Sequence, residues 1–215
     1  MKHLARHFAF LLSVSAVVGV NADVNREEAP PVQLVVTAAD GTEQVVEAGG
    51  TFTAPEAGDY SVAVAPTRRL MLPGASFEYP TSMSYAYDDS DPEAVSWELN
   101  GNDALLMIFP NDADAIAGDL LVSSYVAGIG QILELVDTQP AKPWTVAGEQ
   151  LKGTSVSIDA GGGMLVEQSA YAFTAGQTVY LIVIQNASAE LDRGEESPEV
   201  ESLRDLVGES MKIGE

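Results

Sequence analysis

The sequence of 215 residues has no cysteine and only two histidines, His3 and His7, both near its start. A chain without cysteine forms no disulfide and has no thiol nucleophile. Beyond residue 22 there is no histidine either, so a chain cleaved there could form no Ser-His-Asp triad and no zinc or copper site from histidine or cysteine. Catalysis would need carboxylates, a Ser-Lys pair or a metal with oxygen ligands. We therefore expect a protein that is not an enzyme.

Basic residues are also scarce. The chain has 10 lysines and arginines against 32 aspartates and glutamates, and its formal net charge is −22. A chain this acidic repels nucleic acid phosphates and anionic membrane surfaces, so we expect no nucleic acid partner. A general role of the charge in solubility is the simpler interpretation.

Residues 1–22 have the pattern of an export signal. Lys2 and Arg6 precede the largely apolar run of residues 8–20, and a small-residue cleavage site ends at Ala22. Cleavage there would remove both histidines and leave eight basic residues against 32 acidic ones, a net charge of −24. The alternative is an uncleaved membrane anchor, but the run is shorter than the roughly 20 apolar residues that span a bilayer. We predict a periplasmic or secreted protein with no membrane span after cleavage.

Residues 23–66 are predicted to form a flexible N-terminus and a short β segment. The segments "VQLVVTA" and "QVVEAG" flank Asp40-Gly41, a dipeptide that favours a hairpin turn. In "GDYSVAVA", the residues Tyr60, Val62 and Val64 alternate as in a half-buried strand.

Residues 67–215 are predicted to form the main domain. Strands flank Pro80, and Asn100-Gly101 joins two further strands. Asn111 or Asp112 then caps a predicted helix that runs to about Gly128. Its expected buried face consists of Ile116, Leu120, Leu121 and Tyr125.

The second half of this domain is predicted to form strands followed by a closing helix. "GEQLKGTSVSI", "GMLVEQSAYAF" and "TVYLIVIQ" are predicted antiparallel strands, and the apolar residues 180–184 indicate a central strand covered on both faces. Ser197-Pro198 begins a helix with an apolar stripe formed by Val200, Leu203, Leu206 and Val207. The fold class is therefore α+β, with an antiparallel β-sheet flanked by helices and preceded by a small β segment.

Three segments, "SFEYPTSM", "AYAFTAGQTVYLIVIQ" and "LRDLVGESMKI", resemble the PsbP-like superfamily, which includes exported domains of the PsbP and DcrB types. The resemblance covers roughly residues 70–213. This chain differs from the family pattern at Met211, where we expect an aromatic residue. The segment before Pro66 has no obvious counterpart in the family. The resemblance implies an α-β-α sandwich that serves as a non-catalytic accessory or binding module. It implies no catalytic residue.

One acidic cluster is a candidate calcium site. Asp88, Asp89, Asp91 and Glu93 in "YDDSDPE" supply oxygen donors that suit a hard cation. The stretch lacks the glycine and the distant glutamate of an EF-hand loop, and it could equally be a turn in which side chains bond their own backbone. A second acidic group, Asn111, Asp112 and Asp114, is better explained as a helix cap.

Arg68 and Arg69 are the only adjacent basic pair beyond the signal segment. In so acidic a chain the pair is a candidate contact for a partner. The alternative is that both arginines neutralise nearby carboxylates on the surface.

These observations favour an exported, non-catalytic accessory or protein-binding module of the bacterial envelope, whose partner is an unidentified envelope or extracellular protein. The alternative is a calcium-dependent or carboxylate-based protein that binds or acts on carbohydrate. Trp97, Trp144 and the seven tyrosines distinguish the two hypotheses. Aromatic rings along an exposed face would favour sugar stacking, whereas aromatic rings in the core would favour the first hypothesis.

Overall fold

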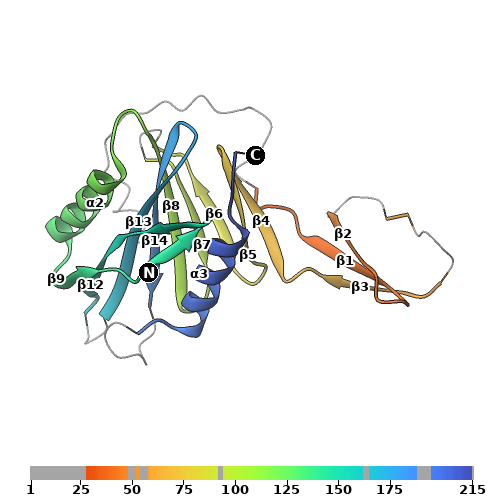
Figure 1. Cartoon of the computed structure of the whole chain (residues 1–215). Helices are drawn as coiled ribbons and strands as arrows, with labels where there is room; N and C mark the ends of the chain where they lie inside the picture. Colours follow the sequence, from red (N-terminus) through yellow and green to blue (C-terminus); the bar gives the residue numbers. More distant parts are fainter. Residues whose placement is uncertain are drawn as a thin grey trace.

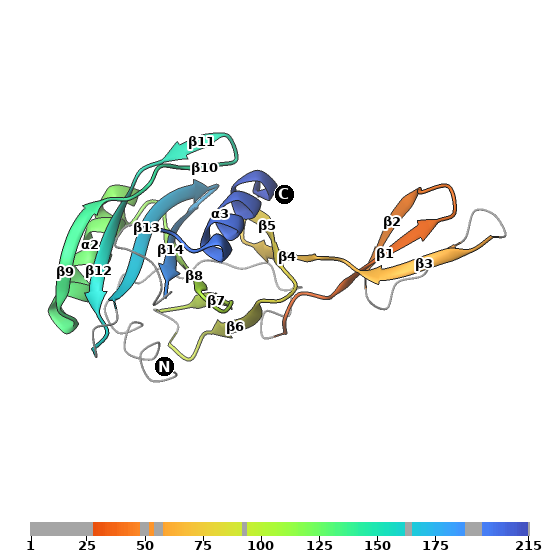
Figure 2. The same cartoon turned by 90° about the horizontal axis from the view of Figure 1, so that it is seen from below.

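The computed structural model describes residues 28–47, 52–53, 58–91, 94–161, 165–187 and 195–214. The predicted signal peptide, residues 1–22, lies outside the described residues. The described part combines antiparallel sheets with two helices, which confirms the α+β class. A three-stranded sheet formed by residues 33–64 projects from a larger body that contains α2 (Gly118–Ile132) and α3 (Pro198–Ser210) (Figures 1 and 2). We call this projecting sheet the arm.

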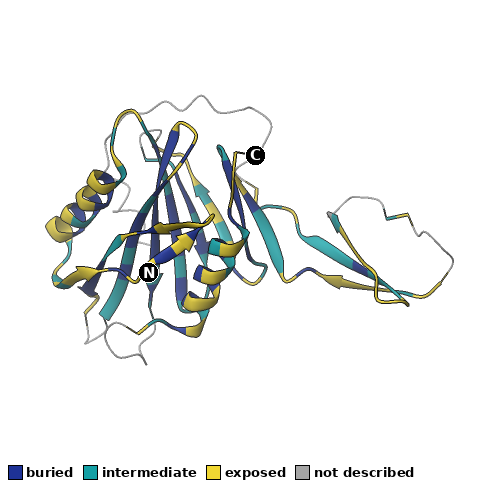
Figure 3. Ribbon diagram, viewed as in Figure 1, coloured by how far each residue is buried: buried dark blue, intermediate teal, exposed yellow. Residues whose placement is uncertain are grey.

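The arm has the strand order β2-β1-β3. Its strands are β1 (Gln33–Ala38), β2 (Glu43–Glu47) and β3 (Tyr60–Val64). The predicted hairpin at Asp40-Gly41 is confirmed, because Gly41 has a φ of +85° and the Thr42 amide donates to Asp40 Oδ1 at 2.9 Å. The half-buried face predicted for β3 is wrong: Val62 and Val64 are 61% and 57% exposed. They lie on an edge strand of a small sheet that stands away from the body (Figure 3).

The body is built on a seven-stranded antiparallel sheet in the order β6-β7-β8-β14-β13-β12-β9. Its strands are β6 (Ser84–Asp88), β7 (Ser96–Asn100), β8 (Ala104–Asp112), β9 (Leu135–Pro140), β12 (Gly153–Asp159), β13 (Leu165–Ala175) and β14 (Thr178–Asn186). The predicted strands "GMLVEQSAYAF" and "TVYLIVIQ" are confirmed as β13 and β14, whereas "GEQLKGTSVSI" is divided into β12 and a short strand of another sheet, residues 149–151. The central strand β14 is buried almost throughout, as its continuous apolar run predicts.

The two faces of β14 separate two hydrophobic clusters. Tyr180 and Ile182 pack with residues of α3 (Pro198–Ser210), whereas Leu181 and Val183 pack with residues of α2 (Gly118–Ile132). Because successive side chains of a strand point to opposite faces, the two helices cover opposite sides of the sheet (Figure 2).

Two smaller sheets complete the side that carries α3. One has the order β15-β5-β4, with β4 (Thr67–Leu72), β5 (Ala75–Pro80) and β15 (Lys212–Ile213). The other is a hairpin of β10 (Trp144–Val146) and β11 (Glu149–Leu151). The break predicted at Pro80 is therefore confirmed, and it separates strands that belong to different sheets.

The start of α2 differs from the prediction. Asn111 and Asp112 do not cap it, because β8 continues to Asp112, which pairs with Thr178 of β14. The helix begins at Gly118 after an N-cap residue, Ala117, that has no side-chain cap. Asp112 instead accepts a hydrogen bond from the Asp114 amide at 2.9 Å, which forms a turn.

The buried face of α2 is predicted only in part. Leu121 and Tyr125 are buried, but Leu120 is 61% exposed. Ile116 is half-buried but precedes the helix, and the face that meets the sheet consists of Leu121, Val122, Tyr125, Gly128 and Ile129. The helix also continues past Gly128 to Ile132.

The closing helix α3 agrees with the prediction. Ser197 Oγ accepts from the Val200 amide at 3.2 Å, and Pro198 is the first helical residue. Of the predicted stripe, Val200, Leu203 and Val207 are buried and Leu206 is half-buried. The helix therefore lies with its apolar stripe on the sheet.

Candidate functional site

A groove runs along α3 and consists of two adjoining pockets of about 490 and 660 Å³. The pockets share Lys142, Glu201 and Arg204. One extends over the strands towards Ser155, and the other lies against the β10–β11 hairpin near Trp144. We call the combined feature the α3 groove.

Arg204 is the centre of the groove. It is only 4% exposed, because it follows Val200 by four residues and so lies on the stripe of α3 that packs on the body. Its guanidinium donates to the Tyr171 hydroxyl at 2.6 Å and to the Glu196 carboxylate. It also lies 5.7 Å from the Trp144 ring and 5.3 Å from the Tyr171 ring, within the range of cation–π attraction.

The aromatic partners of Arg204 are themselves held in place. Trp144 Nε1 donates to the Arg204 carbonyl at 2.9 Å, and the Tyr171 hydroxyl donates to the Lys142 carbonyl at 2.7 Å. The Trp144 and Tyr171 rings meet edge to face at 5.4 Å. Burial raises the pKa of Tyr171, and the Arg204 charge opposes this rise. The hydroxyl therefore stays protonated and can donate.

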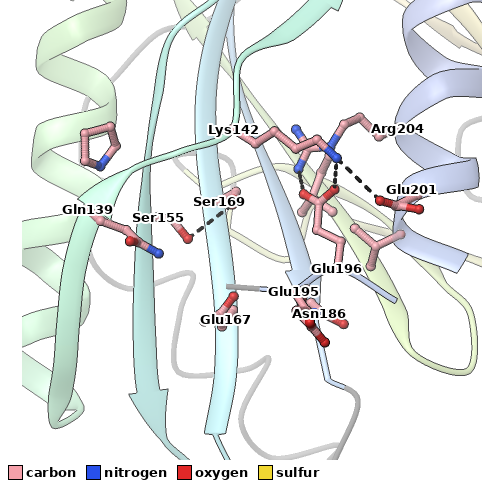
Figure 4. A pocket seen from close by; sticks show the side chains of 13 residues that line it. Gln139, Lys142, Ser155, Glu167, Ser169, Asn186, Glu195, Glu196, Glu201 and Arg204 are labelled. Carbon is pink, nitrogen blue, oxygen red and sulfur yellow. Dashed lines mark hydrogen bonds and ion pairs between the residues drawn. The ribbon is translucent and has the colours of Figure 1, made fainter. Parts of the chain in front are cut away.

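Lys142 is the second cation of the groove. Its ammonium group lies 3.2 Å from Glu196 and 3.5 Å from Glu201, and its side chain is 58% exposed. The hydrogen bond with Glu196 raises the pKa of Lys142 above its ordinary value, and Glu201 adds to the rise. Figure 4 shows Lys142 and Arg204 converging on Glu196. Both cations of the groove therefore already have carboxylate partners.

Carboxylates are in excess over these two cations. The acidic residues that line the groove are Glu167, Glu195, Glu196, Glu201, Asp205 and Glu209. Lys142 and Arg204 are the only basic lining residues among those that the structure describes, so the described lining has a formal net charge of −4. Two of its buried polar atoms, Arg204 Nε and Asn186 Oδ1, have no partner in the described part of the chain. The groove therefore has a surplus of negative charge and of hydrogen-bonding capacity.

The predicted calcium ligands lie elsewhere. Asp88 ends β6, and Asp89 and Asp91 follow in the connection to β7, where Asp88 Oδ1 accepts from the Ser90 amide at 2.9 Å. Glu93 lies outside the described residues. Among the residues that are described, no three acidic side chains are grouped closely enough to hold a metal ion. Because Glu93 is not placed, the calcium site stays a prediction.

The predicted basic pair is also outside the groove. Arg69 on β4 forms an ion pair with Glu78 at 2.9 Å, as the neutralising alternative expects. Arg68 donates to the Pro30 carbonyl at 3.5 Å, at the base of the arm. A contact of Arg68 and Arg69 with a partner stays a prediction.

Sequence reasoning missed the groove. Its clearest signal was Arg204, a charged residue on the apolar stripe between Leu203 and Val207. Long charged side chains are rarely fully buried unless they are paired, so this position implied a partner. Nothing local marked Lys142 or Glu196, which reach Arg204 only through the fold.

The aromatic residues are mostly in the core. The buried ones are Trp97, Trp144, Tyr79, Tyr125, Tyr171 and Tyr180, and the other three tyrosines are half-buried. All nine lie within the described ranges, and none forms an exposed platform. This arrangement favours the binding-module hypothesis over sugar stacking.

Comparisons with known proteins give structural similarity only. No protein-family model and no curated protein matches the chain. Among solved structures, a cyanobacterial PsbP from Synechocystis is similar at 14% identity with a TM-score of 0.43, and the match covers 74% of this chain and 99% of that one. LpqN of Mycobacterium tuberculosis, described as involved in cell envelope biogenesis, is similar at 15% identity with a TM-score of 0.35, over 70% of this chain and 87% of that one.

A Pseudomonas aeruginosa protein of unknown function, PA94, is similar at 13% identity with a TM-score of 0.32, over 59% of this chain and 87% of that one. The weak resemblance to PsbP-like proteins predicted from the sequence is thus confirmed as a weak similarity, and no functional conclusion rests on it. In the part of the chain that the structure describes, no helix is both long and apolar enough to cross a membrane.

Proposed function

We propose that this protein is an exported, non-catalytic accessory module of the bacterial envelope, periplasmic or secreted, that binds another protein through the α3 groove. The observation that carries this proposal is the charge of the groove. Its two cations, Lys142 and Arg204, already pair with Glu196, and the described acidic residues that line the groove outnumber them six to two. The site is therefore complementary to positive charge.

The occupant is a basic segment of the partner protein. Lysine or arginine side chains would approach the exposed carboxylates of Asp205 and Glu209 on the outer part of the groove. Such contacts raise the rate of encounter and select against acidic partners more than they add affinity. The polar wall near Gln139 and Ser155 offers hydrogen bonds to the peptide backbone.

The predicted export signal supports the location, and the lack of histidine and cysteine after residue 22 supports a non-catalytic role. We further propose that residues 67–215 form a PsbP-like α-β-α sandwich, preceded by residues 23–66 as a separate β segment. The positions of α2 and α3 on opposite faces of one sheet support this arrangement.

A cross-linked pull-down with a charge-reversed groove tests the proposal. The tagged chain is recovered from the native envelope or medium, and its partners are identified by mass spectrometry. The test variant carries Asp205→Lys and Glu209→Lys. The matched control carries Asp114→Lys and Asp119→Lys, two exposed acids near α2, so both variants change charge equally.

The proposal expects one protein that is enriched with the wild type and the control but lost with the groove variant. Recovery that is equal for both variants would place the contact outside the groove. No protein enriched with the wild type would contradict the binding function itself.

A further inference from the structure

Among the described residues, strand β3 of the arm is an edge strand whose own sequence lacks the usual protection. In the described structure it pairs only with β1, and its residues, 60–64, read YSVAV, with no charge and no proline. Natural edge strands are commonly blocked by charges, prolines or bulges that prevent pairing with another chain. The opposite edge strand, β2, begins and ends with glutamate. The two edges of the arm therefore differ in how open they are to a further strand.

The backbone groups of β3 that face outward can be assigned. The Ala65 amide donates to the Gln33 carbonyl at 2.8 Å. The backbone groups of every second residue before Ala65, beginning with Ala63, therefore also face β1. The amide and carbonyl groups of Val62 and Val64 therefore point away from the arm. On β2 the Ala38 amide of β1 donates to the Thr42 carbonyl, so the backbone of Thr42 faces β1. By the same alternation, the Val45 amide points away from β1.

The side chains of β3 extend an apolar face. Cross-strand register places Val62 beside Val36, and Val64 beside Leu34, on one face of the sheet. Exposure rises across this face from 6% at Val36 to 61% at Val62. The apolar surface is thus covered at the central strand and bare at the β3 edge.

The negative charge of the arm favours a basic strand as the binding partner of the β3 edge. Residues 27–66 contain seven acidic residues and no lysine, arginine or histidine. A second copy of this chain would bring an equally acidic arm, whereas a basic strand would be attracted.

We infer that β3 is a strand-addition site for an extended basic segment of a partner protein. The added strand would hydrogen-bond to Val62 and Val64, place its apolar residues beside theirs and carry lysine or arginine on its other face. This surface is separate from the α3 groove, so the two proposals can fail independently.

The test uses a short synthetic peptide in which valine alternates with lysine and threonine, and a matched peptide with glutamate in place of lysine. Binding to the full chain is measured by fluorescence anisotropy. Val62→Pro removes an outward amide of β3 but leaves the pairing with β1. Val45→Pro is the matched control, because Val45 is 57% exposed and its amide points outward from the other edge.

We expect the lysine peptide to bind, the glutamate peptide not to bind, and Val62→Pro to weaken binding about tenfold, the loss expected for a few backbone hydrogen bonds. Val45→Pro should leave binding unchanged. Circular dichroism confirms the fold of each variant. If Val62→Pro does not fold, Val62→Lys and Val45→Lys make the same comparison, because a lysine at the edge repels a basic strand.

Equal losses in the two variants, equal binding of the two peptides, or no binding by the wild type would overturn the inference. Sedimentation of the wild type provides a further test. A dimer that Val62→Pro abolishes would show that the occupant is a second copy, which would also contradict the proposal of a basic partner.

Discussion

The buried ion pair in the α3 groove makes a quantitative prediction about stability. Glu196 pairs with both Arg204 and Lys142, and its side chain is 14% exposed, whereas Glu201 pairs only with Lys142 among the described residues and is 57% exposed. Glu196→Gln keeps the size of the side chain but leaves the charge of Arg204 buried without its carboxylate. Removing one partner of a buried pair typically destabilises a protein by about 3–5 kcal/mol.

We expect a loss of about 3 kcal/mol for Glu196→Gln, at the lower end of that range, because glutamine can still accept a hydrogen bond and Tyr171 keeps its own contact with Arg204. In a domain of this size this corresponds to a fall in melting temperature of about 10 °C. Glu201→Gln, the matched control, should cost less than about 1 kcal/mol.

Urea unfolding followed by circular dichroism measures both variants. Replacing both Glu196 and Arg204 by Met should cost less than Glu196→Gln alone, because no charge is then left buried. If Glu196→Gln and Glu201→Gln have the same free energy of unfolding, the reasoning about the buried pair is refuted.

Three further predictions concern other parts of the chain. Burial raises the pKa of Glu98 above its ordinary value of 4.5, so the ionised form of Glu98 opposes folding. Glu98→Gln should therefore raise the unfolding midpoint at neutral pH. This advantage should disappear as the pH falls below 4.5, where the glutamate is protonated in both states. A constant advantage down to lower pH would contradict this. Gly153→Ala should destabilise the fold by about 2 kcal/mol, because the new Cβ would lie 2.6 Å from the Tyr171 ring, whereas Gly58→Ala meets nothing within 4 Å and should be neutral in the same melts. If Asp88, Asp89, Asp91 and Glu93 bind calcium, the ion at a hundred times its dissociation constant should add about 2.7 kcal/mol in a thermal melt compared with chelator; an unchanged melt would remove the site.

Local sequence patterns predicted the positions of helices and strands better than they predicted the contacts of these elements with the rest of the fold. The hairpin at Asp40-Gly41 and the start of α3 at Ser197 follow from the backbone preferences of a few adjacent residues, so the sequence was sufficient. The start of α2 was missed because Asp112 can either cap a helix or extend a strand. Its pairing with Thr178, a residue distant in sequence, determines the outcome.

Burial was harder to predict for the same reason. The alternation of Val62 and Val64 indicated a strand but could not show that the arm leaves this edge uncovered. In the candidate site, the position of Arg204 on an apolar stripe was visible in the sequence. The convergence of Lys142 and Glu196 on Arg204 depends on the packing of β10 and α3 and could not be predicted.

The central claim is that a partner protein binds in the α3 groove, and site-specific photo-cross-linking tests it most directly. A photoreactive residue replaces Glu209 in the groove or, as the control, Asp119 on α2 at the opposite side of the sheet; both acids are exposed and helical. In cells that make the full chain, the account predicts a discrete cross-linked protein from position 209 and none from position 119. Cross-linking from position 119 alone, or from neither position, would contradict the claim.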